Sequence, residues 1–256
     1  MAYVEFLWTR RMFAWFAGIA AILGILIVGA AVSVPGHVHI GGPRAVPFGS
    51  VFSIAGYATC IMATMISATL NRDREHLAYL WTRPIPRIRI ALTYFLVDVA
   101  TLVVAFAVVA VVAAFVMSNL RGLTLVADPN AGTTLLRFIA LPLMWYAVVE
   151  AVTSWNGLKG PAAGGISWAV FWGLLILAAV KLPAPFMAIV AVLNIFNPLA
   201  YFISNGHSTL LDPVTLSEVN GRDLIPMDYG VQTVLAYAIF LGGCAFAAYA
   251  WKRMEA

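Results

Sequence analysis

Two carboxylates occur inside long apolar stretches of the sequence, where an ionised side chain needs a partner or a task. Glu150 lies deep in one of these stretches, and Asp98 lies near the start of another. Charge is costly in the hydrocarbon of a bilayer, so such carboxylates pair with other groups or serve substrate and proton pathways. Glu150 could contact a substrate, relay protons or pair with a polar group of a neighbouring helix. For Asp98, we favour a structural pairing with an arginine at the membrane surface over a role in transport.

The sequence holds no motif for nucleotide binding or hydrolysis. G-x-x-x-x-G-K-[ST], H-E-x-x-H and G-x-S-x-G, which bind phosphate, hold catalytic zinc or expose a nucleophilic serine, are all absent. His37 and His39 could chelate a metal, but two histidines among glycines and prolines are more typical of an exposed loop. Cys60 and Cys244 both lie in apolar segments, which predicts buried, unreactive thiols. We therefore expect no catalytic residue, metal site or cofactor in this chain, and no enzymatic activity.

The most charged window of the chain runs from Asn71 to Ala91. Its charged or titratable residues are Arg72, Arg74, Arg83, Arg87 and Arg89 together with Asp73, Glu75 and His76. Asn71 is a suitable N-cap, and acidic residues suit the first turn of a helix. Four apolar residues then recur at i, i+3, i+4 and i+7, namely Leu77, Leu80, Trp81 and Pro84. This spacing predicts a helix over residues 71–83 with one apolar and one basic face, ended by Pro84 and Pro86.

The composition indicates what kind of element must hold these residues. Of the 256 residues, 62% are hydrophobic and only 10% are charged, whereas soluble domains carry about 25% charged residues. A chain this apolar could not cover its surface in water, which predicts an integral membrane protein. The net charge is +4, but the basic residues cluster beside apolar runs, where they set membrane orientation. Nucleic acid is therefore not an expected partner.

Six apolar runs are long enough for transmembrane helices, and they cover residues 12–34, 48–70, 88–117, 134–155, 163–180 and 230–251. The aromatic-rich residues 1–11 predict an interfacial helix. Residues 184–202 are apolar but are interrupted by Asn194, Asn197 and Pro198, which predicts an external re-entrant hairpin. The expected fold class is thus an all-α membrane protein, with one transmembrane domain over residues 1–256.

The basic residues predict the orientation of these helices. Ten of the 15 fall on the side that holds both termini and the charged window: Arg10, Arg11, Arg72, Arg74, Arg83, Arg87, Arg89, Lys159, Lys252 and Arg253. The other five lie on or near the opposite face: Arg44, Arg121, Arg137, Lys181 and Arg222. By the positive-inside rule, both termini and the window face the cytoplasm in a multi-pass protein of the cell (inner) membrane.

The order of these parts resembles the permease subunit of ABC-2 type (type V) ATP-binding-cassette exporters. The best local match is the segment R-x-R-E-H-L-x-x-L-W-T-R-P-x-x-R between the second and third apolar runs. The resemblance covers essentially the whole chain. It implies that residues 71–83 are the coupling helix, seated in a groove of a separate nucleotide-binding subunit.

The resemblance also implies the partners and the site residues. The expected interface with the ATPase subunit consists of Arg72, Arg74, Glu75, His76, Leu77, Leu80, Trp81 and Arg83, with Lys159 in a smaller contact at the turn 156–161. Two ATPase subunits, which hold the ATP and Mg²⁺, would join two permeases, identical or different. The second and fifth runs would face the pathway and residues 184–202 would form an external lid, so Glu150, Asn194 and Asn197 are pathway or lid candidates. An amphipathic, lipid-like or drug-like molecule is the expected cargo.

Two other functions remain open. A proton-coupled secondary transporter that uses Glu150 and Asp98 would show inverted repeats, but the window 71–91 has no counterpart after the fifth run. A non-transporting membrane scaffold would float its amphipathic helix on lipid and favour lysines along the polar side. The window contains no lysine, and Asp73 and Glu75 interrupt its basic face. This pattern favours docking onto a protein.

Overall fold

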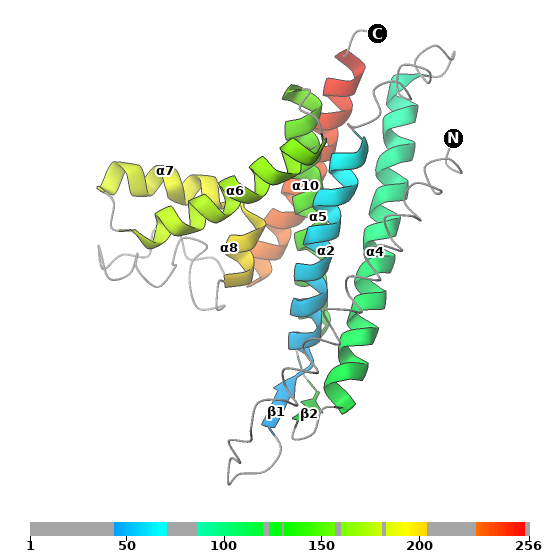
Figure 1. The fold of residues 1–256 in the computed structure, drawn as a ribbon, viewed down its shortest axis with the longest axis vertical. Coiled ribbons are helices and arrows are strands. Elements are labelled where there is room, and N and C mark those ends of the chain that lie inside the picture. The colour runs from blue at the N-terminus through cyan, green and yellow to red at the C-terminus, as the bar shows by residue number, and fades with distance from the viewer. Residues whose placement is uncertain are drawn as a thin grey trace.

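The computed structural model describes residues 44–70, 86–119, 123–127, 129, 131–156, 160–180, 183–203 and 229–253. The expected span over 12–34, the interfacial segment 1–11 and the coupling helix over 71–83 lie outside these residues. The described part is mostly helical. Its elements are β1 (Arg44–Pro47), α2 (Gly49–Leu70), α4 (Arg87–Asn119), β2 (Leu123–Val126), α5 (Ala131–Asn156), α6 (Gly160–Ala179), α7 (Ala184–Asn194), α8 (Pro198–Ile203) and α10 (Tyr229–Arg253) (Figure 1).

Prolines mark where several of these helices begin. Proline fixes φ and has no N–H to donate, so it suits the first turn, where that N–H would have no partner within the helix. The first turn of α4 is closed by the amide of Arg89, which donates to the carbonyl of Pro86 at 2.9 Å. Helix α7 follows Pro183 in the same way, with the amide of Phe186 at 2.9 Å from the Pro183 carbonyl.

A short parallel strand pair departs from the expected all-α fold class. β1 and β2 pair in the register of Arg44 with Leu123 through Pro47 with Val126, and both fall between the apolar runs expected to form transmembrane helices. The pair lies at the end of the molecule where α2 and α5 begin and α4 ends (Figure 1). The two strands are far apart in the sequence and only four residues long. They therefore carry no local hairpin signal and too little alternation to be recognised.

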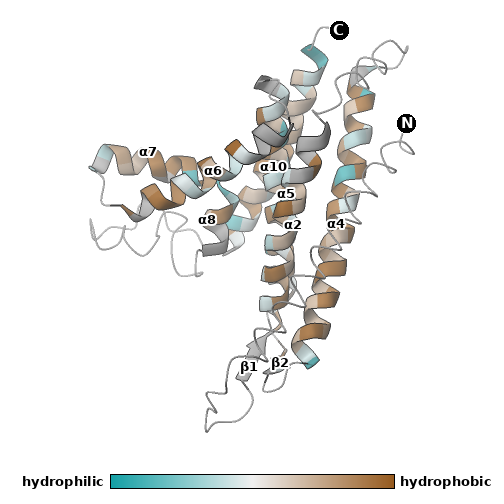
Figure 2. Ribbon diagram, in the orientation of Figure 1, coloured by the Kyte–Doolittle hydropathy of each residue, from teal (hydrophilic) through white to brown (hydrophobic). Residues whose placement is uncertain are grey.

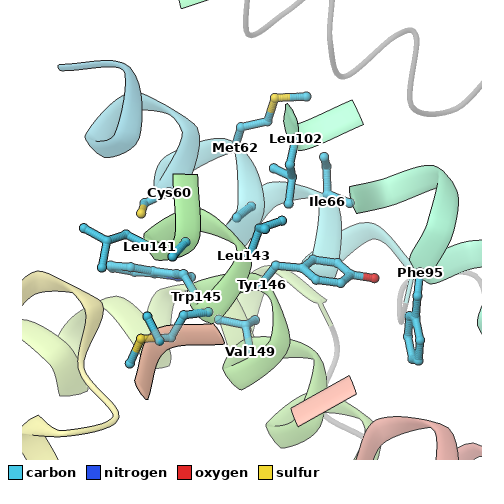
Figure 3. Packing of buried hydrophobic residues seen from close by; sticks show 14 of the residues in the cluster. Cys60, Met62, Ile66, Phe95, Leu102, Leu141, Leu143, Trp145, Tyr146 and Val149 are labelled. Atoms are coloured by element: carbon cyan, nitrogen blue, oxygen red, sulfur yellow. The ribbon is translucent and has the colours of Figure 1, made fainter. Parts of the chain in front are cut away.

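Helix α5 lies at the centre of the described helices. It packs most extensively against α10 and α2, and Figure 3 shows its buried side chains gathered beside those of α2 and α4. Two glycines allow the close approach: a Cβ on Gly56 would lie 2.9 Å from the carbonyl oxygen of Phe138, and one on Gly243 would lie 2.9 Å from that of Ala147. Small residues at such contacts let membrane helices pack by backbone proximity.

Helices α6 and α7 extend sideways from the group formed by α2, α4, α5 and α10 (Figure 1). Aromatic rings connect α6 to α5: the Trp145 ring lies 4.7 Å from that of Trp168 and 4.8 Å from that of Phe171. Helix α7 packs on α6 through a narrow stripe, since Met187, Val190 and Asn194 are buried and most of its other described side chains are exposed.

Three described helices are long and apolar enough to cross a membrane: Ile88–Asn119, Ala131–Ser154 and Gly230–Arg253. The two shorter ones have 24 residues each, or about 36 Å at 1.5 Å per residue, and a bilayer core is about 30 Å thick. Much of α4 is hydrophobic (Figure 2), and its side chains Leu96 and Phe115 are 71% and 69% exposed. Such a surface suits contact with lipid.

Candidate polar site between α4, α5 and α10

The two carboxylates that the sequence singles out lie in one buried region between α4 and α5. Asp98 on α4 and Glu150 on α5 are both fully buried. The hydroxyl of Tyr146, also fully buried, donates a hydrogen bond of 2.8 Å to Oδ2 of Asp98. Glu150 follows Tyr146 by four residues, so it lies one helical turn further along α5. The structure thus brings together Asp98 and Glu150 around a tyrosine.

A second set of hydrogen bonds continues from Glu150 to α10. The hydroxyl of Ser154 lies 3.3 Å from Oε1 of Glu150, and the indole N–H of Trp251 donates to the Ser154 hydroxyl oxygen at 2.9 Å. Tyr146, Glu150 and Ser154 stand at i, i+4 and i+8, so they share one face of α5. We call Asp98, Tyr146, Glu150, Ser154 and Trp251 the polar cluster.

Aromatic rings close the polar cluster off from the surroundings. Phe95 of α4 meets the Tyr146 ring edge-on, with centroids 6.3 Å apart, and also meets the Trp251 ring at 6.2 Å. Tyr94 lies 5.8 Å from Trp251. Phe95 is only 5% exposed and Tyr94 3%. Hydrogen bonds in such a water-poor environment are electrostatically stronger than in water, and a lost partner costs more.

The sequence indicates some members of the polar cluster and misses others. Asp98 and Glu150 stand out as charges in apolar runs. Glu150 pairs with a polar group, because Ser154 hydrogen-bonds to it and connects it to Trp251 of α10. The i, i+4, i+8 spacing could have added Tyr146 and Ser154. Trp251 carries no such signal, because a tryptophan beside Lys252 and Arg253 fits an aromatic belt at the membrane surface equally well.

Asn194 and Asn197 lie at the break between α7 and α8, where they connect this break to α6. The side-chain amide of Asn197 donates to the carbonyl of Phe171 at 2.9 Å and to Oδ1 of Asn194 at 2.9 Å, and its own Oδ1 accepts the amide of Leu199 at 3.1 Å. Asn194 donates to the carbonyl of Leu174 at 3.4 Å. A helix break in an apolar medium needs its backbone groups paired. Oδ1 of Asn197 pairs one of them, the N–H of Leu199, while the side-chain amides attach the break to α6.

Replacing Asn197 with alanine is expected to lower the free energy of unfolding by about 1–2 kcal/mol, because it leaves the buried amide of Leu199 without its side-chain acceptor. Asn119 is the matched control: its amide donates to the Phe115 carbonyl at 2.7 Å, but at the exposed end of α4. Asn119→Ala is expected to change stability by no more than about 0.5 kcal/mol. Thermal unfolding of the purified variants in detergent measures both, and equal shifts would contradict the buried amide's role.

The remaining candidates fall outside this cluster. The expected ATPase interface (Arg72, Arg74, Glu75, His76, Leu77, Leu80, Trp81, Arg83 and Lys159) and the histidines His37 and His39 lie outside the described residues. In α2 and α10, Cys60 is buried and Cys244 half-buried, and both are free thiols. Among the described residues, no three His, Cys, Asp or Glu side chains are grouped to hold a metal ion.

Comparison with protein-family models and with curated proteins gives no match to this chain.

Proposed function

We propose that this chain is the permease subunit of an ATP-driven exporter of the ABC-2 type, with ATP hydrolysed by a separate subunit that docks on the helix expected over 71–83. The observation that carries this proposal is the shared end of the described helices. The end of α2, the start of α4, the end of α5, the start of α6 and the end of α10 lie toward one end of the molecule (Figure 1). Both expected contacts, 71–83 and the turn 156–161, are bounded by helix ends on this side.

Helix α4 is suited to convey a movement of the docked segment into the membrane. It begins at Arg87, directly after the expected coupling helix, and continues for 33 residues without an internal proline. A continuous helix of about 50 Å is longer than a bilayer core, so a displacement at its first turn reaches the opposite surface. Domain movements in proteins are commonly passed on by rigid elements of this kind.

The proposal includes the finer architecture expected from the sequence. In this proposal α2, α4, α5, α6 and α10 are five of six membrane spans, both termini are cytoplasmic, and residues 184–202 form an external re-entrant hairpin. Two permease subunits and two ATPase subunits form the working unit. The proposed cargo is an amphipathic, lipid-like or drug-like molecule.

The test is recovery of the ATPase subunit with the permease. The chain is expressed with the ATPase subunit encoded beside it, and wild type is compared with the double variant Leu77→Asp/Trp81→Asp. Two carboxylates on the apolar face of the docking helix would be desolvated in the groove, so we expect the double variant to reach the membrane but to lose the partner and its ATPase activity.

Tyr79→Asp is the matched control, since position 79 lies on the opposite face of a helix that presents Leu77, Leu80 and Trp81 together. We expect it to retain the partner. If no ATPase subunit accompanies the wild-type chain in detergent or nanodiscs, the exporter proposal fails.

A second candidate function is favoured by one observation: Asp98 and Glu150 are both fully buried, and Asp98 accepts a hydrogen bond from Tyr146, one turn before Glu150. A proton-coupled transporter needs such acids inside the membrane. It would move cargo in response to a pH gradient in vesicles that contain this chain alone. Transport that requires the ATPase subunit and ignores the gradient would exclude it.

A further inference from the structure

We propose that the hydrogen bond from Tyr146 to Asp98 holds α4 to the α5–α10 pair during transport, so that these three helices move as one body. This inference rests on the proposed function, in which movement enters the membrane through α4. Tyr146 and Asp98 are thus positioning residues. They act through the helices that they connect and not by contact with cargo.

The contacts of α4 show why a side-chain connection to α5 matters. The backbone of α4 packs mainly against α2 and α10 and only sparsely against α5. Across this wider gap, the long phenol of Tyr146 reaches Oδ2 of Asp98 at 2.8 Å. Phe95, one turn before Asp98, packs edge-on against the same ring. The Tyr146 side chain is therefore a principal contact by which α5 holds α4.

The polar cluster extends the connection from α5 to α10. On the same face of α5, Ser154 lies within hydrogen-bond distance of Glu150 and accepts a hydrogen bond from the Trp251 indole of α10. Trp251 also packs against Tyr94 and Phe95 of α4. Each of the three helices is thus connected to the other two by buried side chains of the cluster and its aromatic neighbours.

Polar groups are an expensive way to hold membrane helices if only stability is required. Buried apolar residues of the same shape would hold α4 against α5 without any desolvation of a carboxylate. A single hydrogen bond between membrane helices changes an equilibrium by about 3-fold on average, and by at most about 20-fold. Its direction, however, fixes which atoms face each other. The Tyr146–Asp98 bond therefore specifies one relative position of α4 and α5, as expected of a part that must move as a unit.

The test measures helix separation in the complete complex of permease and ATPase subunit in nanodiscs. Spin labels are placed on exposed positions, Val111 of α4 with Val234 of α10, and Val111 with Ile189 of α7 as a second pair. In the wild type we expect the distance between α4 and α10 to stay narrow and unchanged on addition of ATP, while the distance between α4 and α7 shifts. In Tyr146→Phe, the distribution between α4 and α10 is expected to broaden and to shift with ATP.

Tyr237→Phe is the matched control, because the Tyr237 hydroxyl also connects two helices, donating to the Leu136 carbonyl of α5 at 3.2 Å, but at an exposed position. It is expected to leave the distance between α4 and α10 narrow. Asp98→Leu removes the acceptor, and in this background Tyr146→Phe is expected to add no further broadening.

Two outcomes overturn the inference while the exporter proposal stands. In one, the ATPase subunit binds, but ATP shifts the wild-type distance between α4 and α10 as much as that between α4 and α7. In the other, Tyr146→Phe behaves like Tyr237→Phe, or broadens the distribution equally with and without Asp98. Failure of the ATPase subunit to bind wild type is instead the failure of the proposed function.

Discussion

Truncation of Trp251 to alanine is expected to lower the free energy of unfolding by about 3 kcal/mol, the lower end of the range for a deleted buried tryptophan. Trp251 is 1% exposed and is among the largest fully buried side chains of the described residues. Its ring packs against Tyr94 and Phe95, and its indole N–H donates to Ser154. In lipid the transfer of the ring from water contributes little to helix association, but the cavity and the lost hydrogen bond remain.

The measurement is the unfolding transition of the purified protein in mixed detergent. Trp172→Ala is the control, because Trp172 is 43% exposed on α6 and its removal opens no cavity. Trp251→Phe keeps an aromatic ring but removes the N–H, so it is expected to cost about 1 kcal/mol, the value of one hydrogen bond. A loss in Trp172→Ala as large as in Trp251→Ala would show that the packing of Trp251 is not special.

The positions of the long helices could be predicted from the sequence because one property determines them. Helices α2, α4, α5, α6 and α10 begin and end within a few residues of the apolar runs expected over 48–70, 88–117, 134–155, 163–180 and 230–251. Apolar length is a local signal, and the backbone of an apolar run can pair its own groups only as a helix. That three of these helices are long and apolar enough to cross a membrane follows from the same signal.

The contacts between helices could not be predicted in the same way, since they depend on which faces meet. The hydrogen bond from Tyr146 to Asp98 joins residues that lie 48 positions apart, so no local pattern in the sequence indicates it. The strand pair β1–β2 was missed because its partners come from separate loops. Hydropathy gives the helices α4 and α5 but not their relative rotation, and that rotation decides which side chains meet.

Asn194 and Asn197 mark, in the sequence, the place where an apolar run is interrupted, but the sequence does not give the contacts of their side chains. Two asparagines and a proline in an apolar run predict an external re-entrant hairpin over 184–202, and in this segment the structure has α7, a break at 195–197, and α8. The sequence left these asparagines as pathway or lid candidates. In the structure their amides donate to carbonyls of α6, which an isolated segment could not reveal because the acceptors belong to another helix.

Two adjacent glycines of α10 are expected to respond in opposite directions to the same substitution. Gly243 faces α5, where an added Cβ would lie 2.9 Å from both the Cβ and the carbonyl oxygen of Ala147. Backbone atoms cannot move aside as a flexible side chain can, so Gly243→Leu must separate α5 from α10. We expect a loss of about 2–3 kcal/mol in the free energy of unfolding, at the upper end of the usual cost of overpacking.

Gly242 provides a matched control, because the same glycine-to-leucine substitution is made at the adjacent position of α10. An added Cβ there meets nothing within 4 Å, so Gly242→Leu keeps the packing and gains helix propensity, about 0.8 kcal/mol relative to glycine. Unfolding of both variants in the same mixed detergent gives the comparison. Because α5 packs more extensively against α10 than against any other described helix, equal stability of the two variants would mean that the α5–α10 contact is not formed as described.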